Sequence, residues 1–569
     1  MLDTLKKRFD SDDYYKVLSL LFIMAVILIF MGIGLRSPWP ADEPRFAEVA
    51  REMVVSGNWF FPIRGGELYP DKPPVFMWSI AFFYWLTDSI NVAFLLPNAL
   101  ASLVTLFCIY DIASRLWNVR VARNAALLLM IAPQFLIQAK NAQIDAMVTC
   151  WITVAMYGLI RHFFVAPHWR WYFTSFAFMG LGIITKGVGF LPILFLIPVL
   201  ALHFTKRHNF SGAVSWRLWA GPLAMLAVIA MWLFPMLHLA EASGNPDFIA
   251  YKNNILFKQT GERYANSWTH VKPWYYFIVN AIPSLWFPLP FLLINKKIWN
   301  IARDNRHLIA IFTWIVLVVA FFSLSPGKRG VYIFPALPML SLFLAPYISH
   351  HNPQRWFNIS LKAITILLPI AFISVSLLLW LDNEKLIDQL THHTQKAPFM
   401  AFFACAAVIV IIVLIYERKQ LALKQFGIAI LATWLIYTSW GYVLLEPIRT
   451  PAKQIMAKAA EIAGKGGELG IVRYREQFLL FSPVPLTQFS YLSSDAEQMR
   501  NAWLWMKSSP QNRYVVMADT AHLECFDATK AVDLGEGHGN EWWLFSSEAM
   551  LENCTPPQKI KIYHMPFNH

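Results

Sequence analysis

The chain has 569 residues, 57% of them hydrophobic, and its mean hydropathy is +0.44. Because a soluble domain is roughly 45–50% apolar, and because the apolar residues here fall in blocks of about 20, the composition excludes an ordinary soluble protein and indicates a polytopic α-helical membrane protein. The net charge of +13 does not indicate a nucleic-acid partner, because the basic residues form short clusters between apolar blocks rather than one basic face.

The amino-terminal segment MLDTLKKRFDSDDYYK is basic and precedes an apolar run at residues 17–35. The run is too long for the core of a signal peptide and lacks a small-residue cleavage site, so we expect a retained first span. By the positive-inside rule the basic residues hold this end in the cytoplasm, which places the following loop, residues 36–90, on the outer face.

The polar stretch of this first loop begins PWPADEPRFAEVARE and ends ELYPDKPP, so it carries several charges between two apolar segments. Charge at a membrane is expensive unless function requires it. A helix start explains Glu43 as the cap before a proline, but it does not explain Asp42, which is a candidate catalytic or orienting carboxylate with Arg45 one turn on. In YPDKPP the prolines hold an extended backbone, and a turn alone needs neither Asp71 nor Lys72.

Later in the same loop, after YPDKPP, the segment VFMWSIAFFYWLT is short and aromatic, so we expect a helix lying in the outer interface. With the first span, the later apolar blocks make about 13 transmembrane helices. The later spans are predicted near residues 91–114, 124–138, 146–161, 172–185, 188–204, 218–239, 274–294, 308–324, 331–348, 361–381, 399–416 and 426–445.

Basic clusters alternate along this series and fall on the cytoplasmic side, among them Lys206-Arg207, Lys296-Lys297 and Arg418-Lys419. The odd number of spans places residues 446–569 outside, as a second domain after the membrane domain of residues 1–445. There PAKQIMAKAAEIAG predicts an amphipathic helix, and ELGIVRY, RYVVMAD and KIKIYHM predict strands, which together indicate a small periplasmic α/β domain. Of the five cysteines, only Cys525 and Cys554 lie where they can pair, and the sequence leaves open whether they do.

Nine basic residues fall at outer-face loops, against the topological preference: Lys72, Lys140, Lys186, Lys252, Lys258, Arg263, Lys272, Lys328 and Arg329. An anion at the outer face, such as the phosphate of a lipid, explains their retention. The alternative is that outer loops simply carry solvated lysines.

Further candidates lie at turns between spans. Asp145 starts a span and Lys186 stands in a Thr-Lys-Gly turn; taken singly, each also fits a helix-end charge. The segment SPGKRGVY, which contains Lys328, Arg329 and Tyr332, is a glycine-bounded basic turn suited to a phosphate. The sequence shows no P-loop, Ser-His-Asp order or DxD motif, so a lipid-linked donor fits better than a nucleotide.

At these motifs the chain resembles the lipid A aminoarabinose transferases, which belong with the protein O-mannosyltransferases to the GT-C membrane glycosyltransferases. The resemblance covers most of residues 36–345 and implies a GT-C fold with a periplasmic C-terminal domain. It runs in order through ADEPRFAEVAREMVVSGNW, YPDKPP, Asp145, ITKGVGFLPI, DFIAYKNNILFKQTGERYA, PWYYFIVNAIPSLWF and FFSLSPGKRGVYIFP.

The resemblance implies transfer of a sugar, 4-amino-4-deoxy-L-arabinose or another aminosugar, from undecaprenyl phosphate to lipid A at the periplasmic face of the bacterial inner membrane. The family's two acids fall on Asp42 and Asp145 as catalytic residues, and its cavity-capping tyrosine falls on Tyr332. Asp71 stands where the family usually has glutamate. The predicted substrate-binding residues are Glu43, Arg45, Asp71, Lys72, Lys186, Arg263, Lys328, Arg329 and Tyr332.

The family often has a histidine a few residues before Arg263, whereas this chain reads FKQTGERYA, so a metal site relying on that histidine is in doubt. We predict no required cofactor and name no metal ligand, and a divalent cation stays open. We expect a monomer in contact with membrane lipids. The alternatives are a GT-C transferase that glycosylates a protein or another glycan, and a lipid transporter without chemistry, which inverted repeats and charged broken spans would favour.

Overall fold

The structure is a computed structural model that describes residues 11–208, 210, 212–256, 270–385, 395–418, 420–519 and 523–567. The chain forms two compact units, and each is described by itself. Unit 1 comprises Met1–Ile33, Leu95–Gly244 and Lys252–Leu444; unit 2 comprises Gly34–Phe94, Asn245–Tyr251 and Leu445–His569. The first loop therefore groups with the carboxy-terminal residues.

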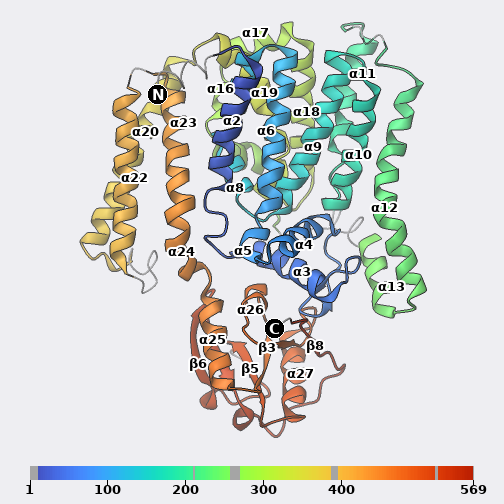
Figure 1. The fold of residues 1–569 in the computed structure, drawn as a ribbon, viewed down its shortest axis with the longest axis vertical. Helices are drawn as coiled ribbons and strands as arrows, with labels where there is room; N and C mark the ends of the chain where they lie inside the picture. Colours follow the sequence, from blue (N-terminus) through green and yellow to red (C-terminus); the bar gives the residue numbers. More distant parts are fainter. Residues whose placement is uncertain are drawn as a thin grey trace. The chain divides into compact units, whose positions relative to one another are not determined.

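Unit 1 is a helical bundle in which α9 packs along α6 and α10, and α20 packs along α22 (Figure 1). In chain order its helices are α2 (Tyr14–Phe30), α6 (Leu96–Leu116), α7 (Val119–Met130), α8 (Pro133–Ala139), α9 (Ile144–Ile160), η1 (Arg161–Val165), α10 (Trp169–Lys186), η2 (Leu191–Phe195), α11 (Leu196–Phe204), η3 (Trp216–Ala220), α12 (Gly221–Ala242), η5 (Phe277–Ala281), α15 (Ile282–Leu285), α16 (Leu289–Leu292), α17 (Lys296–Asp304), α18 (Arg306–Leu324), η6 (Gly330–Ile333), α19 (Ala336–His350), α20 (Arg355–Trp380), α22 (Lys396–Tyr416), α23 (Ala422–Ile436), η7 (Tyr437–Gly441) and α24 (Tyr442–Arg449), which runs on into unit 2.

Seven helical stretches in the described part of the chain are long and apolar enough to cross a membrane, and each overlaps a predicted span. They are Ile90–Leu116, Ile144–Val165, Trp216–Ala242, Arg306–Leu324, Arg355–Trp380, Lys396–Tyr416 and Ala422–Arg449. Shorter apolar helices include Tyr14–Phe30 and Ala336–His350. The polytopic helical class is thus confirmed, whereas the total of about 13 spans stays a prediction.

Several predicted spans are not single continuous helices, among them the following two. The span near residues 124–138 is the pair α7 and α8, bent by 72° between Met130 and Pro133. The span near residues 274–294 is divided into the short helices η5, α15 and α16. Prolines cause both departures, because a proline lacks the N–H for the helical ladder and disfavours a helical conformation at the preceding residue.

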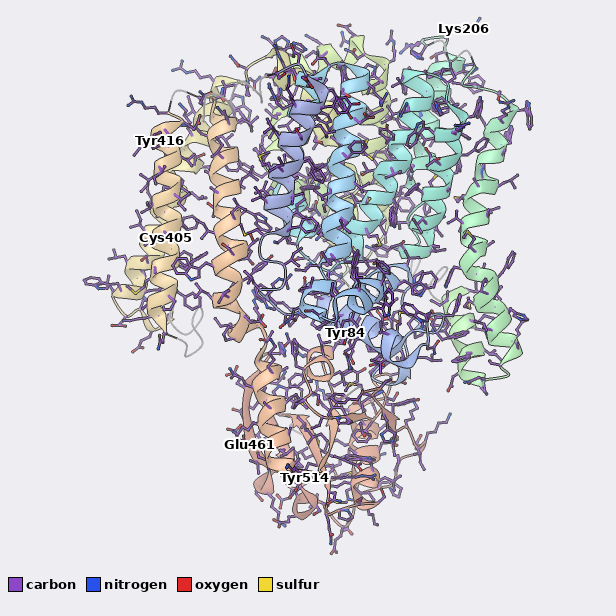
Figure 2. All side chains as sticks on the ribbon, viewed as in Figure 1. Tyr84, Lys206, Cys405, Tyr416, Glu461 and Tyr514 are labelled. Carbon is purple, nitrogen blue, oxygen red and sulfur yellow. A yellow bond between two sulfur atoms is a disulfide. The ribbon has the colours of Figure 1, made fainter. Side chains whose placement is uncertain are left out.

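Figure 2 shows Lys206, just after α11, and Tyr416, at the end of α22, at the same end of the unit 1 helices. The α17 helix with its two leading lysines lies at this end too (Figure 1). Three of the predicted cytoplasmic clusters therefore gather at one end of the bundle, as the alternation of spans requires.

Unit 2 joins the first loop to a mixed α/β domain. The loop forms α3 (Glu43–Ser56), β1 (Ile63–Arg64), β2 (Glu67–Leu68), α4 (Val75–Thr87) and α5 (Ile90–Ala93), and α13 (Pro246–Asn253) begins in this unit. The domain forms α25 (Pro451–Ala463), β3 (Glu468–Val472), α26 (Glu476–Leu480), β4 (Leu486–Gln488), α27 (Asp495–Lys507), β5 (Arg513–Ala518), η8 (Ala528–Lys530), β6 (Val532–Gly537), β7 (Asn540–Phe545), η9 (Ser547–Ala549) and β8 (Tyr563–His564).

The six-stranded sheet has the order β6-β7-β5-β3-β4-β8, with β3 parallel to β4 and β5 and the other pairs antiparallel. Side chains alternate along β5: Val516 joins the apolar cluster that includes α25 and α26, while Val515 and Met517 join the cluster that includes α27. Helices therefore cover both faces of the sheet. The predicted helix and all three predicted strands are present, although the last strand is reduced to Tyr563 and His564.

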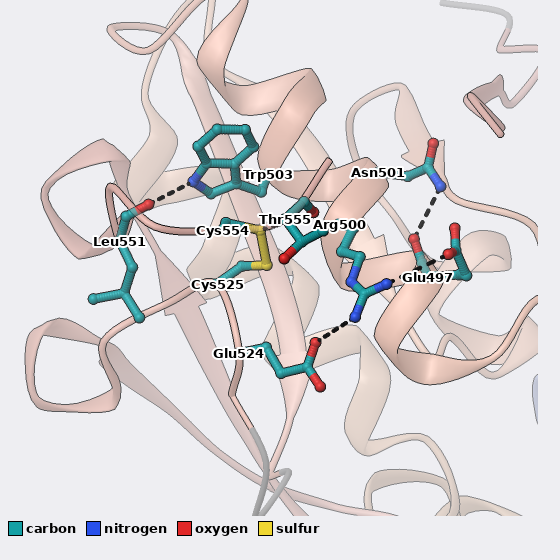
Figure 3. Close-up of a disulfide and its surroundings, with 9 residues drawn as sticks. All are labelled: Glu497, Arg500, Asn501, Trp503, Glu524, Cys525, Leu551, Cys554 and Thr555. Carbon is teal, nitrogen blue, oxygen red and sulfur yellow. Dashed lines mark hydrogen bonds and ion pairs between the residues drawn. A yellow bond between two sulfur atoms is a disulfide. The ribbon is translucent and has the colours of Figure 1, made fainter. Parts of the chain in front are cut away.

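Cys525 and Cys554 form a disulfide in the cluster around α27 (Figure 3). Trp503 Nε1 donates a hydrogen bond to the carbonyl oxygen of Leu551 at 3.0 Å, and Arg500 pairs with Glu524 at 3.0 Å. The bridge and these contacts tie the loop after β5 and the segment after η9 to the helix.

Candidate functional site

Three of the predicted site residues come together in unit 1. Lys186 Nζ forms an ion pair with Asp145 Oδ1, and it lies 4.7 Å from the centre of the Tyr332 ring. The two charged side chains are 15% and 11% exposed. An acid, a cation and a ring from three separate segments thus share one location.

Helix ends explain how these two charges are placed. Asp145 lies in the first turn of α9, where the helix dipole favours an anion, and Lys186 is the last residue of α10, where it favours a cation. Gly187, with φ of 87°, ends α10 in the left-handed conformation and turns the chain away. Asp145 and Lys186 are therefore helix-end charges and at the same time partners in an ion pair.

The SPGKRGVY turn is fixed mainly by its own buried lysine. Lys328 is 4% exposed, and its Nζ donates to the carbonyl oxygens of Lys272, at 2.9 Å, and Ser325. Its backbone N–H donates to the carbonyl oxygen of His270 at 3.0 Å. Burial lowers the pKa of Lys328. The side chain therefore holds the turn closed, which the sequence analysis did not foresee.

A second anchor holds the same turn from the bent helix pair. Gln134 Nε2 donates to the carbonyl oxygen of Gly330 at 2.9 Å, and Trp286 Nε1 donates to Gln134 Oε1 at 2.6 Å. Arg329 is half-buried, and its carbonyl oxygen accepts from the N–H of Tyr332 at 3.0 Å. The bend before Pro133 thus brings a polar side chain to the turn that carries Tyr332.

In unit 2, the two neighbouring acids of the first loop have different positions. Asp42 is the N-cap residue of α3, one position before the predicted cap, and its side chain makes no capping hydrogen bond. Glu43 accepts from Arg36 Nη2 at 2.8 Å, from Arg36 Nη1 and from the N–H of Trp39 at 2.9 Å. Arg36 and Glu43 are 2% and 5% exposed. The prediction of Glu43 as the cap was wrong, because its carboxylate is the counter-ion of a buried arginine.

Two further acids of α3 fix the loop after it. Glu48 pairs with Arg51 at 2.7 Å, and Glu52 accepts from the N–H groups of Gly65 and Gly66, the latter at 3.0 Å. Burial and the neighbouring Glu48 charge raise the pKa of Glu52 well above its ordinary value. The β1–β2 hairpin is therefore held on α3.

Arg45 lies one turn into α3 and pairs with Glu476 at 2.8 Å. Burial acts to lower the pKa of Arg45, but the charges of Glu476, Tyr69 and Asp42 outweigh it, and the pKa lies above its ordinary value. Burial and the Asp71 charge raise the pKa of Tyr69 to about 12. Asp42, Arg45, Tyr69 and Asp71 are thus electrostatic neighbours in unit 2, and Lys72 follows directly in the chain.

Several predicted outer-loop cations have structural partners. Lys140 is 1% exposed and donates to the carbonyl oxygen of Met31, and Lys252 pairs with Glu241 at 3.2 Å. Lys258 and Arg263 lie outside the described residues. Lys140 and Lys252 are therefore held by protein groups, an outcome that neither the lipid-anion explanation nor the alternative of solvated lysines predicted.

Sequence reasoning missed the residues after the last span that hold the first loop. Glu446 accepts from the N–H of Ser37 at 3.0 Å, from Trp39 Nε1 at 2.9 Å and from Lys453 Nζ at 2.6 Å. Glu476 and Gln477 also contact this loop. No local signal reveals such pairs, because the partners lie more than 400 residues apart in the sequence.

Within the described ranges, no group of three or more His, Cys, Asp and Glu side chains is arranged to hold a metal ion. The prediction that no metal is required is not tested by this finding.

Comparisons with known proteins match this sequence and fold. Residues 71–234 match the family model described as dolichyl-phosphate-mannose-protein mannosyltransferase. An undecaprenyl phosphate-alpha-4-amino-4-deoxy-L-arabinose arabinosyl transferase of Yersinia pestis (strain Pestoides F) is 28% identical over 342 residues, 58% of each chain. The second transferase of that description in Sodalis glossinidius (strain morsitans) is 30% identical over 337 residues, 57% of this chain and 58% of its own. The chain thus matches under two thirds of these relatives' length.

The crystal structure of ArnT from Cupriavidus metallidurans bound to undecaprenyl phosphate has a TM-score of 0.69 at 21% identity, over 95% of this chain and 99% of that one. Its apo structure has a TM-score of 0.70 at 21% identity, over 94% and 99%. The resemblance to the aminoarabinose transferases is confirmed. Their fold extends over nearly the whole chain.

Proposed function

We propose that this protein is a glycosyltransferase that moves 4-amino-4-deoxy-L-arabinose, or another aminosugar, from undecaprenyl phosphate to lipid A. The names of the relatives support this donor and sugar. The proposed location is the periplasmic face of a bacterial inner membrane, with the protein as a monomer.

The observation that carries this proposal is the buried group of Asp145, Lys186 and Tyr332. The three residues come from different segments, and the motif resemblance assigns each of them to the site. A buried charge pair beneath an aromatic ring is costly to maintain for stability alone, and it suits a polar substrate at a membrane.

In the proposed reaction the bond between the sugar C1 and the undecaprenyl phosphate oxygen breaks, and C1 bonds to an acceptor oxygen. The phosphate leaves as an anion. Lys72, Arg263 and Arg329 are proposed to stabilise its charge, since fixed cations aimed at a developing charge are a large catalytic term. Lys328 supports this turn from within, rather than binding the phosphate.

The role of Asp42 depends on the acceptor. A lipid A phosphate is already ionised near neutral pH, so Asp42 would orient the reaction or hold the sugar amine; a hydroxyl acceptor would have to give its proton to Asp42. Asp145, paired with Lys186, is the second proposed acid. No step in this scheme needs a metal ion, and a divalent cation remains open.

The proposed sidedness has two supports. The basic clusters gather at one end of the unit 1 helices (Figures 1 and 2), as a cytoplasmic end would. The Cys525–Cys554 disulfide fits an oxidising compartment such as the periplasm for the domain that contains it. A total of about 13 spans would place residues 446–569 there.

Mass spectrometry of lipid A from cells with and without the protein tests the function. An added aminoarabinose mass on lipid A, dependent on the protein, is the expected result. Cells that carry Asp145→Asn serve as the matched control at equal expression. An unchanged lipid A together with a newly glycosylated protein or glycan would instead assign a different acceptor to the same chemistry, and no transfer to any acceptor would contradict an enzyme.

A further inference from the structure

One carboxylate of the C-terminal domain pairs with two arginines of the first loop. Glu476, the first residue of α26, accepts through Oε1 from Arg45 Nε at 2.8 Å and from Arg64 Nη1 at 3.0 Å. Arg45 belongs to α3 and Arg64 to β1. A single acid therefore joins two elements of the loop: α3, which ends before Gly57, and β1, which follows it in the sequence.

Arg64 depends on this acid for its charge balance. Its guanidinium lies 3.6 Å from the ring centre of Tyr491, 5.1 Å from that of Tyr69 and 5.9 Å from that of Tyr474. Its side chain is 9% exposed, and its Nε is buried without a hydrogen-bond partner among the described residues. Within the described ranges, Glu476 is the only carboxylate paired with it. A buried cation that loses its only counter-ion becomes strongly unfavourable.

The two arginines flank the residue that leads into the YPDKPP turn. Arg45 and Arg64 both act on the Tyr69 hydroxyl electrostatically, and Tyr69 is 1% exposed. Asp71 and Lys72 follow two and three positions later. The position of this turn is therefore set by groups that Glu476 holds.

Neighbouring residues strengthen the same attachment. Gln477 Nε2 donates to the carbonyl oxygen of Pro38 at 3.1 Å, and Tyr491 OH donates to that of Leu68 at 2.9 Å. Glu67 accepts from Ser490 Oγ at 2.8 Å. The first loop is thus bound to the C-terminal domain before α3, at β1 and at β2, with the doubly paired acid between them.

We propose that Glu476 is a positioning residue for the transfer reaction: it holds Arg45 and Arg64 and thereby fixes the Asp71–Lys72 turn for the donor. The C-terminal domain then belongs to the framework of the active site rather than forming an accessory module. This inference rests on the proposed function of Lys72 and its neighbours.

Hydrogen exchange of the full-length protein in detergent tests the attachment without relying on activity. In Glu476→Gln the amides of residues 58–72 should exchange faster than in the wild type, because the loop loses its ionic link. The matched control is Glu468→Gln, which breaks the ion pair of 2.8 Å between Glu468 and Arg513 in the same domain. The control should leave exchange in residues 58–72 unchanged.

Kinetics with a lipid-linked sugar donor test the consequence for the site. Glu476→Gln should raise the KM for the donor about tenfold, with kcat within about threefold, because a displaced charge-assisted contact weakens binding. Glu476→Asp retains the charge and should recover part of the affinity. If Glu476→Gln does not fold, the donor KM of Glu476→Asp tests the inference in its place.

The outcomes are separable. Wild-type protein without transfer activity would end the proposed function, while the exchange experiment would still decide whether Glu476 holds the loop. Unchanged exchange in Glu476→Gln would overturn the inference, as would faster exchange with a wild-type donor KM. A purely structural role would lower the yield of folded protein without the KM change or its recovery in Glu476→Asp.

Discussion

At the scale of single residues, the acids at the start of α3 show how adjacent positions take different functions. Glu43 forms a buried ion pair with Arg36. Asp42 is half-exposed at the N-cap position, where its side chain makes no capping hydrogen bond. A carboxylate that does not perform the usual structural task of its position is the better candidate for chemistry.

Asp42→Asn should therefore lower turnover by orders of magnitude while leaving the thermal stability of the protein nearly unchanged, at most about 1 kcal/mol. The reason is that asparagine keeps most hydrogen bonds but not the charge. Glu43→Gln should destabilise the protein by about 3–5 kcal/mol, because it removes the carboxylate that pairs with the buried Arg36.

Transfer assays and thermal unfolding of both purified variants measure this contrast. Near-normal turnover in Asp42→Asn would return Asp42 to a structural role and move the search for the catalytic carboxylate to Asp145. A stable Glu43→Gln would contradict the importance assigned to the Arg36 pair.

Lys72 in YPDKPP and Lys328 in SPGKRGVY should differ in the effect of their substitution by alanine. Lys72→Ala should reduce use of the lipid-linked donor by about 1.5–3 kcal/mol, the value of a charge-assisted contact, without loss of folded protein. Lys328→Ala should instead lower stability, because its ammonium donates to the carbonyl oxygen of Ser325 in its own turn and to that of Lys272 in an earlier segment.

Donor titrations and unfolding temperatures for the two variants, with Arg329→Ala beside them, decide the matter. Arg329→Ala should behave like Lys72→Ala. Wild-type donor kinetics in Lys72→Ala would contradict the phosphate-binding role of Lys72. A Lys328→Ala variant that is stable but uses the donor poorly would instead assign Lys328 to phosphate binding.

At the scale of elements, the β6–β7 turn carries a half-buried histidine against α26. His538 Nε2 lies 2.7 Å from Gln477 Oε1, and since Gln477 Nε2 donates to two carbonyl oxygens, the histidine is the donor. Burial, and then the Arg475 charge, lower the pKa of His538 to about 4. The folded domain therefore holds this histidine neutral at neutral pH.

The stability of the C-terminal domain should fall as the pH falls from about 6.5 toward 4, the interval between the ordinary and the folded pKa of His538. Above about pH 6.5 the stabilising contribution is fully present, because both folded and unfolded forms are then neutral. Unfolding temperatures measured across this range should show a smaller acid loss in His538→Gln. The control is His564→Gln, at an exposed histidine, and an equal acid loss in His538→Gln and wild type would refute the assignment.

Elements set by local patterns were predictable, and elements set by distant contacts were not. Long apolar blocks predicted the membrane helices. The sequence Ser-Asp-Ala-Glu is a local signal for the start of α27, where the Ser494 side chain accepts a hydrogen bond from the N–H of Glu497. The bend between α7 and α8 follows from Pro133, yet an apolar count ignores it. Among the site residues, Asp145 and Lys186 were found because motif position and helix ends coincide. Glu476 was not, since its partner Arg45 is 431 residues away.

At the scale of the whole molecule, charge distribution and disulfide chemistry bear on sidedness independently. The lysines and arginines at one end of the unit 1 helices favour the cytoplasm, while an oxidised Cys525–Cys554 pair favours the opposite compartment for its domain. Both agree only if an odd number of spans precedes residue 446.

Fusions of a reporter that is active only outside the cytoplasm, placed at Glu446 and at Glu417, test this directly. The Glu446 fusion should be active and the Glu417 fusion inactive, because α23, η7 and the first residues of α24 lie between the two positions, within the stretch Ala422–Arg449 that is long and apolar enough to cross a membrane. The disulfide provides a second readout in the intact protein: thiol alkylation before and after reduction should show Cys525 and Cys554 protected only before it. A cytoplasmic signal from the Glu446 fusion would remove the outer placement of the first loop as well, since unit 2 contains both that loop and the residues after Leu445, and the proposed reaction would lose its compartment.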